Sequence, residues 1–282
     1  MKEFQIGLWF IIKLSINKLL RFKIFTLPYI KNVHGYKKQI FWECGGGYLA
    51  YYWGIATAMH ELYTPEVCEK LVLSGSSAGS IISFCLKSRE NLKTLFSENY
   101  LSLCRKLILQ PFGGFYNLNS AIKLEYENVI NKHPSEVFIN KKHNLFSTSL
   151  HLNVLCPLFS YISMSYEFEN ANDLVECALA SHGIPFVIGS PKYTILPHPT
   201  KWFYYRIDSG FLTMLLGRIY GYQALMPYGE HVSTAVICPS TFRPCNPINL
   251  WMWMSPEHNR KLYNLGYTDA MGNLDKLENI IR

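Results

Sequence analysis

Short apolar runs alternate with longer mixed stretches along most of the 282-residue chain, which is typical of α/β proteins. Apolar residues dominate positions 39–42 and 71–73, and this predicts two buried strands. Residues 48–62, between them, have the length and composition of a helix. Together these elements predict one βαβ unit, whose right-handed crossover brings the ends of both strands to one edge of a parallel sheet. Ligand sites of open α/β sheets lie at that edge.

The same patterns predict further elements after this unit. Helices are expected across residues 90–106, 119–131 and 170–180 and from 259 to about 265, with Ser120 as the candidate cap of the second. Strands are expected at residues 144–150, 161–165, 204–208 and 232–237. Residues 213–218 fit either a loop or a short helix. We therefore expect an α/β fold without internal repeats.

The second strand is followed at once by Gly75-Ser76-Ser77-Ala78-Gly79, a G-x-S-x-G pattern that leads into an apolar stretch. This pattern predicts a nucleophile elbow, a tight strand-to-helix turn that strains and exposes the serine. Gly75 and Gly79 supply the lack of bulk that the turn needs, and the helix N-terminus favours an alkoxide at Ser77. The alternative is an ordinary turn, because so short a match also arises by chance.

Three consecutive glycines, Gly45, Gly46 and Gly47, follow the first strand. They let several backbone N–H groups point toward one spot at a helix N-terminus. An acyl-transfer enzyme needs such donors as an oxyanion hole, where the negative oxygen of the tetrahedral intermediate forms. The alternatives are a plain glycine-rich turn or a phosphate-binding loop, and the absence of G-x-G-x-x-G and G-K-[ST] argues against the latter.

An aspartate, Asp208, ends the predicted strand 204–208 and is followed by Ser209-Gly210. An aspartate in this position often only caps a turn. With a candidate nucleophile and a glycine loop already in the chain, Asp208 is also the natural general base.

Four stretches, in this order, resemble the patatin-like phospholipases, which are Ser-Asp hydrolases of acyl lipids. They are Gly45–Gly47, Gly75–Gly79, the segment 178–186, which is similar to the family's A-S-x-A-I-P-x-x-F, and Asp208-Ser209-Gly210. Residues 48–54 are nearer the adiponutrin-type branch than the plant storage proteins. The resemblance covers about residues 38–270. Ala50 and Ser209 depart from it, because many members have glycine at both positions.

The resemblance implies a patatin-like three-layer α/β/α fold with a mainly parallel central sheet and a Ser77–Asp208 dyad. It further implies a lipid acyl hydrolase, of the phospholipase A or acylglycerol lipase type, that needs no cofactor. Ser77 would form the acyl-enzyme, Asp208 would act as base, and the N–H groups of Gly46 and Gly47 would hold the oxyanion.

Three alternatives to this mechanism and function stay open. A Ser-His-Asp triad would use His231 or His258, which follow Asp208 in the chain order of α/β-hydrolases. A transacylase would differ only in how well the site excludes water. A lipid-binding or regulatory protein with a catalytically weak dyad is the third.

The positive charge is concentrated at the N-terminus. Residues 1–40 hold eight Lys or Arg and one acid, while the remaining 19 basic and 19 acidic residues cancel. We divide the chain into a basic apolar arm, residues 1–35, and a phospholipase-like domain, residues 36–282. The apolar run 4–12 is too short to span a bilayer. Trp9 and the interleaved lysines predict a helix at the membrane interface, although packing on the domain is the alternative.

The remaining chemistry-bearing residues exclude some classes of site. Eight cysteines show no C-x-x-C or zinc spacing, and nine histidines show no H-E-x-x-H, so no metal is expected. Free, buried cysteines indicate a reducing compartment, so the protein is expected inside the cell, cytoplasmic or peripheral to a membrane. The expected partner is a lipid substrate at a membrane or lipid-droplet surface, and no nucleic acid. The apolar segment 250–254 is expected in the core or at a lipid-facing rim.

Overall fold

The computed structural model describes residues 25–26, 38–64, 67–68, 70–88, 90–110, 117–132, 145–155, 161–165, 168, 171–184, 196–197, 202–226, 232–246, 249 and 255–282. The N-terminal arm before residue 25, His231 and the segment 250–254, on which three of the predictions rest, lie outside these ranges. Among the described residues, none of the helices combines the length and the apolar character needed to cross a bilayer.

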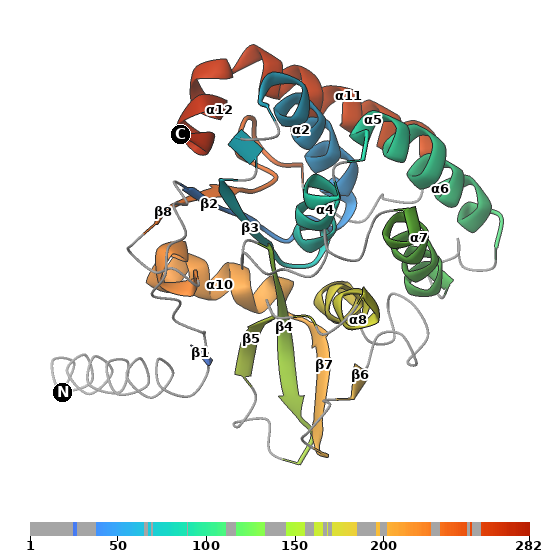
Figure 1. Cartoon of the computed structure of the whole chain (residues 1–282), viewed down its shortest axis with the longest axis vertical. Coiled ribbons are helices and arrows are strands. Elements are labelled where there is room, and N and C mark those ends of the chain that lie inside the picture. The colour runs from blue at the N-terminus through green and yellow to red at the C-terminus, as the bar shows by residue number, and fades with distance from the viewer. Residues whose placement is uncertain are drawn as a thin grey trace, which may run out of the picture.

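An eight-stranded mixed sheet lies at the centre of the described residues, and the chain is therefore an α/β protein (Figure 1). Its strand order is β1-β5-β4-β3-β2-β8, with β7 also paired to β4 and β6 to β7. The strands are β1 Phe25–Thr26, β2 Lys38–Trp42, β3 Leu71–Gly75, β4 Leu145–Asn153, β5 Tyr161–Ser165, β6 Leu196–Pro197, β7 Tyr204–Asp208 and β8 Ser233–Ile237. All six expected strands are confirmed. Strand β1, inside the predicted arm, was not expected, and it pairs with β5.

The predicted βαβ unit is present at the centre of the sheet. Strands β2 and β3 are parallel neighbours, with Lys38 opposite Leu71 and Trp42 opposite Gly75. Helix α2 (Leu49–Leu62) connects them. Strands β8 and β4 extend this parallel part on either side. The ends of β2 and β3 therefore lie at one edge, as their apolar sequence predicted.

Strand β4 joins this parallel part to an antiparallel part. Its first residues pair with β3, while Ser149 to Asn153 pair with β7, which runs in the opposite direction. Ser147 pairs with both Gly75 of β3 and Ser165 of β5, so β3 and β5 lie on opposite edges of β4. Strands β3 and β7 therefore share one edge of β4. The expectation of a mainly parallel sheet is correct for β2, β3, β8 and the start of β4, but β5 and β7 pair with β4, and β6 with β7, in antiparallel fashion.

Helices cover both faces of the sheet. On one face lie α2, α4 (Ala78–Lys87) and α8 (Ala171–His182), and Trp42 packs there against Tyr52 with ring centroids 5.5 Å apart. On the other face, Phe41 packs against Tyr222 at 5.3 Å. Tyr222 belongs to the 3-10 helix η6 (Tyr222–Leu225), which follows α10 (Gly210–Tyr220). Residues 213–218, expected as a loop or short helix, thus belong to α10.

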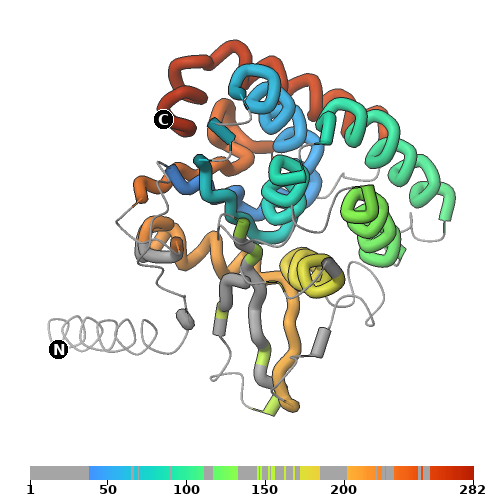
Figure 2. The backbone as a smooth tube through the Cα atoms, viewed as in Figure 1, coloured from blue at the N-terminus to red at the C-terminus, as the bar shows by residue number. Residues whose placement is uncertain are grey.

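The C-terminal helix α11 (Pro256–Gly272) lies beside α2, although the two come from opposite ends of the described chain (Figure 2). Glycines allow this approach, because a Cβ on Gly54 would lie 2.1 Å from the Tyr263 carbonyl oxygen. Helix α2 is consequently buried from Leu49 to Met59, which explains why it is apolar on all sides. The predicted helix starting at 259 is confirmed but is longer than expected.

Four further helical segments pack outside α2 and α4, and the last helix, α12 (Leu274–Ile281), packs against β2, β8 and α11. The four are α5 (Leu92–Thr94), the π-helical turn η2 (Leu95–Tyr100), α6 (Leu101–Ile108) and α7 (Leu118–Lys132). The expected helices 90–106 and 119–131 are therefore confirmed. Ser120 is not the cap of α7, because it lies inside the first turn and its hydroxyl donates to the Asn117 carbonyl at 2.7 Å. With Ser120 as the cap, the helix would begin at residue 121, and it begins three residues earlier, at Leu118.

Candidate active site

Ser77 occupies a strained turn between β3 and α4. Its φ of 54° and ψ of −126° make it the one non-glycine residue with positive φ in the described part of the chain. Such backbone strain clusters at functional sites, where the surrounding structure holds it in place. Gly79 is required here because a Cβ would lie 2.1 Å from the Trp42 carbonyl oxygen. The G-x-S-x-G pattern therefore forms an elbow that exposes part of the Ser77 surface.

Backbone hydrogen bonds hold the elbow against the end of α8. The Ser77 N–H donates to the Ser181 carbonyl at 3.0 Å, and the Asp208 N–H donates to the Gly183 carbonyl at 2.9 Å. Residues 181–183, at the end of α8 and directly after it, thus bind the serine and the aspartate at once. They lie in the middle of the stretch 178–186 singled out in the sequence, and this double contact gives that stretch a positioning role.

Asp208 lies near Ser77 because β3 and β7 run toward each other along the same edge of β4 and end close together. Gly75, at the end of β3, is opposite Ser147, and Asp208, at the end of β7, is opposite Ser149 on the same edge of β4. Two strand residues span about 7 Å, so the side chains that follow β3 and end β7 come together. The Ser77 side chain lies next to the Asp208 carboxyl, because a Cβ on Gly210 would lie 3.1 Å from the Ser77 Cβ and 2.8 Å from Asp208 Oδ1. The Gly210 N–H donates a hydrogen bond to the Asp208 carboxylate.

The surroundings of Asp208 favour a proton acceptor. Burial of the carboxyl raises its pKa to about 6, although the Gly210 N–H and the Ser77 hydroxyl act in the opposite direction. The residue as a whole stays partly exposed beside the half-buried Ser77. Ser209, which departs from the family's glycine, adopts an ordinary φ of −100°. A pKa near the working pH suits a general base.

The three glycines lie at the end of β2, beside the elbow. Gly46 has φ of 47° and is exposed, and it opens the 3-10 helix η1 (Gly46–Tyr48). The Tyr48 N–H donates to the Gly45 carbonyl at 2.8 Å. The first N–H groups of a helix have no partner within it, and those of Gly46 and Gly47 donate to no acceptor in the described ranges. They are therefore free to bind an oxygen of a ligand.

Gly210, the first residue of α10, lies where the glycine loop and the elbow come close together. A Cβ on Gly210 would lie 2.6 Å from the Cβ of Cys44 and 3.1 Å from the Cβ of Ser77. Cys44 directly precedes the glycine loop, so the loop, the elbow and the start of α10 converge on this position. Burial, together with the nearby Asp208 and Glu43 carboxylates, raises the pKa of Cys44 to about 12. The thiol is therefore protonated near neutral pH, which fits packing rather than reactivity.

A buried carboxylate beside the site was missed from the sequence. The Glu43 side chain is only 4% exposed, and it accepts a hydrogen bond from the Tyr222 hydroxyl. Arg218 of α10 lies 3.9 Å from its other oxygen. The signal was a glutamate within an apolar strand end, directly before the glycine loop. Glu43 ties the end of β2 to α10 and so fixes the loop relative to Asp208.

Within the described residues, no histidine contacts Asp208. His258 lies in the first turn of α11, and the neighbouring Asn259 contacts Cys104 of α6 at 3.5 Å. His182 is buried against Tyr126, with ring centroids 6.2 Å apart, and burial lowers its pKa to about 4. His231 lies outside the described residues. Among the described residues, the serine and the aspartate therefore lie side by side without an intervening imidazole.

The described residues contain no group of three or more His, Cys, Asp or Glu side chains placed to hold a metal ion. A scan of the chain against protein-family models found no match, and neither did a search of curated proteins.

Proposed function

We propose that this protein is a serine-dependent carboxylic ester hydrolase of the patatin-like type, acting on acyl lipids. The observation that carries the proposal is Ser77, held in a strained turn with its side chain next to the Asp208 carboxyl. Free glycine N–H groups at the neighbouring strand end support it. The parallel β2-α2-β3-α4 unit, with helices on both faces of the sheet, supports a patatin-like three-layer fold.

In the proposed reaction, Asp208 accepts the proton of the Ser77 hydroxyl while the Ser77 oxygen bonds to the ester carbonyl carbon. The carbonyl electron pair moves to its oxygen, which accepts hydrogen bonds from the N–H groups of Gly46 and Gly47. The C–O bond to the alcohol then breaks, and the alcohol leaves with the proton from Asp208. Water then gives a proton to Asp208 and attacks the acyl carbon of the acyl-enzyme. The bond from that carbon to the Ser77 oxygen breaks, the serine takes the proton from Asp208, and the acid leaves.

An apolar stripe beside the site supports a lipid substrate. Helix α10 starts two residues after Asp208, and its Phe211, Leu215 and Ile219 are 73%, 42% and 55% exposed. Their i, i+4, i+8 spacing places them on one side of the helix. Exposed apolar patches mark contacts with other molecules or membranes. We therefore infer that the enzyme works at a membrane or lipid-droplet surface.

The cysteines support an intracellular, membrane-peripheral location for this activity. No disulfide joins any two of the seven described cysteines, of which three are buried and four are half-buried. Proteins of reducing compartments keep their thiols in this state.

Hydrolysis of p-nitrophenyl butyrate and of mixed phospholipid vesicles tests the proposal. Ser77→Ala and Asp208→Asn should each reduce the rate by about a thousandfold, the size expected for a nucleophile and a general base. Ser97→Ala and Asp275→Asn are matched controls at exposed positions and should keep wild-type rates. An equal loss of hydrolysis rate in folded His231→Ala would show that the site is a Ser-His-Asp triad and not a dyad. Acyl transfer to added alcohol in place of hydrolysis would indicate a transacylase.

A further inference from the structure

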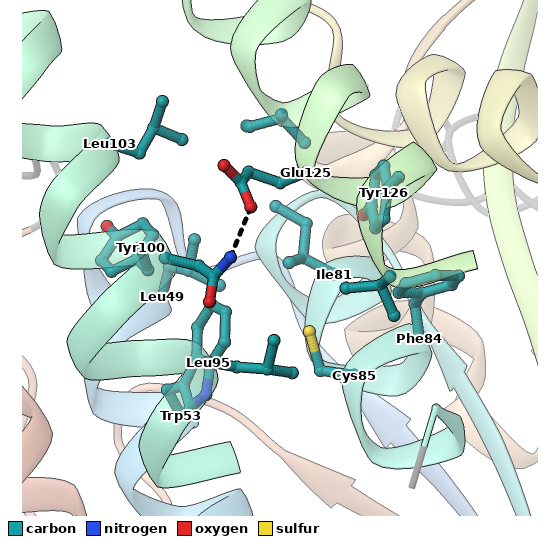
Figure 3. Close-up of a pocket in the computed structure, with 13 residues that line it drawn as sticks. Leu49, Trp53, Ile81, Phe84, Cys85, Leu95, Tyr100, Leu103, Glu125 and Tyr126 are labelled. Carbon is teal, nitrogen blue, oxygen red and sulfur yellow. Dashed lines mark hydrogen bonds between the residues drawn. The ribbon is translucent and has the colours of Figure 1, made fainter. Parts of the chain in front are cut away.

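A cavity lies among α2, α4, α7 and the η2–α6 segment, on the side of the sheet that carries the elbow helix (Figure 3). Its volume is about 60 Å³. A single water needs about 10–15 Å³ of such space, so the cavity has room for several waters or for part of a larger group.

The lining of this cavity is apolar. Phe84, Leu95 and Val129 are at most 6% exposed and contribute only carbon atoms. The indole N–H of Trp53 does not serve the cavity, because it donates to the Leu92 carbonyl at 3.0 Å. A water needs two to four polar partners to be stable in a cavity, whereas dry apolar cavities bind apolar molecules. The chemistry of the lining therefore favours a hydrocarbon occupant.

One polar pair marks the rim of the cavity. Asn99 of η2 donates a hydrogen bond to Glu125 of α7 at 2.8 Å, and both residues are partly exposed. Figure 3 shows this bond on the same side as Leu103, while Trp53 and Leu95 lie at the other end. The pair satisfies its own polar groups and leaves the interior apolar.

Two helices connect the cavity to the candidate active site. Helix α2 begins two residues after Gly47, and it lines the cavity with Leu49 and Trp53. Helix α4 begins directly after Ser77, and it lines the cavity with Ile81 and Cys85. Each pair is spaced i, i+4 and so lies on one side of its helix. Ile81 is one turn, about 6 Å along the axis, from Ser77.

We propose that this cavity binds the hydrocarbon chain of a fatty acyl ester whose carbonyl is held at Ser77. The proposal rests on the proposed function and adds to it that the acyl chain, rather than the alcohol part, is recognised between the helices that carry the glycine loop and the nucleophile. Long-chain esters should accordingly be better substrates than acetyl esters. Narrowing the cavity should remove that preference.

Filling the cavity from two sides tests the proposal. Leu103→Trp from α6 and Ile122→Phe from α7 enlarge half-buried side chains of the lining. Each should lower the ratio of kcat/KM for p-nitrophenyl palmitate to that for p-nitrophenyl acetate about tenfold. Ile108→Trp, on α6 but 45% exposed and outside the lining, is the matched control and should keep the wild-type ratio. Thermal unfolding identifies any variant that fails to fold.

Binding of the fluorescent fatty acid cis-parinarate separates this proposal from the proposed function. Wild type and Ser77→Ala should bind it with similar Kd, and Leu103→Trp should weaken binding about tenfold. If these variants bind cis-parinarate as expected but the wild type hydrolyses no ester, the acyl-binding assignment of the cavity stands and the proposed hydrolase activity is overturned. An unchanged chain-length ratio in folded Leu103→Trp and Ile122→Phe, or equal cis-parinarate binding in all variants, would overturn the cavity assignment.

Discussion

Two aspartates, Asp208 and Asp269, have opposite electrostatic surroundings although both lie against the same core. Asp208 accepts a hydrogen bond from the Gly210 N–H and lies beside the Ser77 side chain, and no cation of the described residues shifts its pKa. Asp269 of α11 is only 8% exposed and accepts from the Tyr51 hydroxyl at 2.8 Å and from the Arg243 guanidinium.

These surroundings move the two pKa values in opposite directions. Burial dominates at Asp208 and raises its pKa to about 6. Burial would raise the pKa of Asp269 too, but the hydrogen bonds from Arg243 and Tyr51 outweigh it, so its pKa is lowered. A carboxylate that is hydrogen-bonded but lacks a cation can take up a proton near neutral pH, whereas one paired with arginine cannot. We infer that Asp208 serves chemistry and Asp269 serves the contact between α2 and α11.

The largest expected effect is on kcat, which should fall when Asp208 is replaced but not when Asp269 is replaced. Asp208→Asn should lower kcat for p-nitrophenyl butyrate about a thousandfold, because the amide cannot accept the Ser77 proton. Asp269→Asn should change kcat less than threefold in the folded protein. Steady-state kinetics on both variants measures this difference, and comparable losses in the two would remove the functional distinction.

The next effect concerns stability and should appear at Asp269. Asp269→Asn weakens hydrogen bonds to a charged partner and should reduce the free energy of unfolding by about 2 kcal/mol. Because Arg243 is 41% exposed, solvent screening keeps this value below that of a fully buried pair. Urea unfolding at pH 7 measures it, with Asp275→Asn as the exposed control. A change within about 0.5 kcal/mol would show that this ion pair adds nothing.

The smallest expected effect is an increase in the free energy of unfolding, opposite in sign to that at Asp269, and it should appear at Asp208. Its folded-state pKa of about 6 lies above the unfolded value of about 3.9, so the folded state binds its proton more tightly. This contribution to stability is present below pH 4 and is lost as pH rises to about 6. At pH 7, Asp208→Asn should therefore be more stable than wild type by about 1 kcal/mol, after allowance for partial exposure. The difference should disappear at pH 4, and urea unfolding at both pH values tests this.

The sequence predicted those parts of the site that depend on local turn chemistry. Gly75, Gly79 and Ser77 specify a strand-to-helix turn within five residues, and Gly45 to Gly47 specify an open helix start. The βαβ unit between them follows from apolar patterning and crossover handedness. These features need no contact between residues distant in the sequence.

Other features depend on long-range pairing that local patterns do not encode. The position of Asp208 at a strand end was predicted, but its meeting with Ser77 requires β3 and β7 to share one edge of β4 in opposite directions. The bond between Glu43 and Tyr222 joins residues 179 positions apart. The cavity is likewise formed by helices that are separated in the chain. Tertiary packing decides these features, so single-sequence patterns could not supply them.

The central claim is that Asp208 activates Ser77 directly, and the pH dependence of covalent labelling tests it most directly. A fluorophosphonate reacts only with an activated serine, and peptide mapping by mass spectrometry identifies the labelled residue. The account predicts labelling at Ser77, with a rate that is half-maximal near pH 6 in wild type and about a thousandfold lower in Asp208→Asn. Labelling of another serine, or a Ser77 rate that is unchanged in Asp208→Asn, would contradict it.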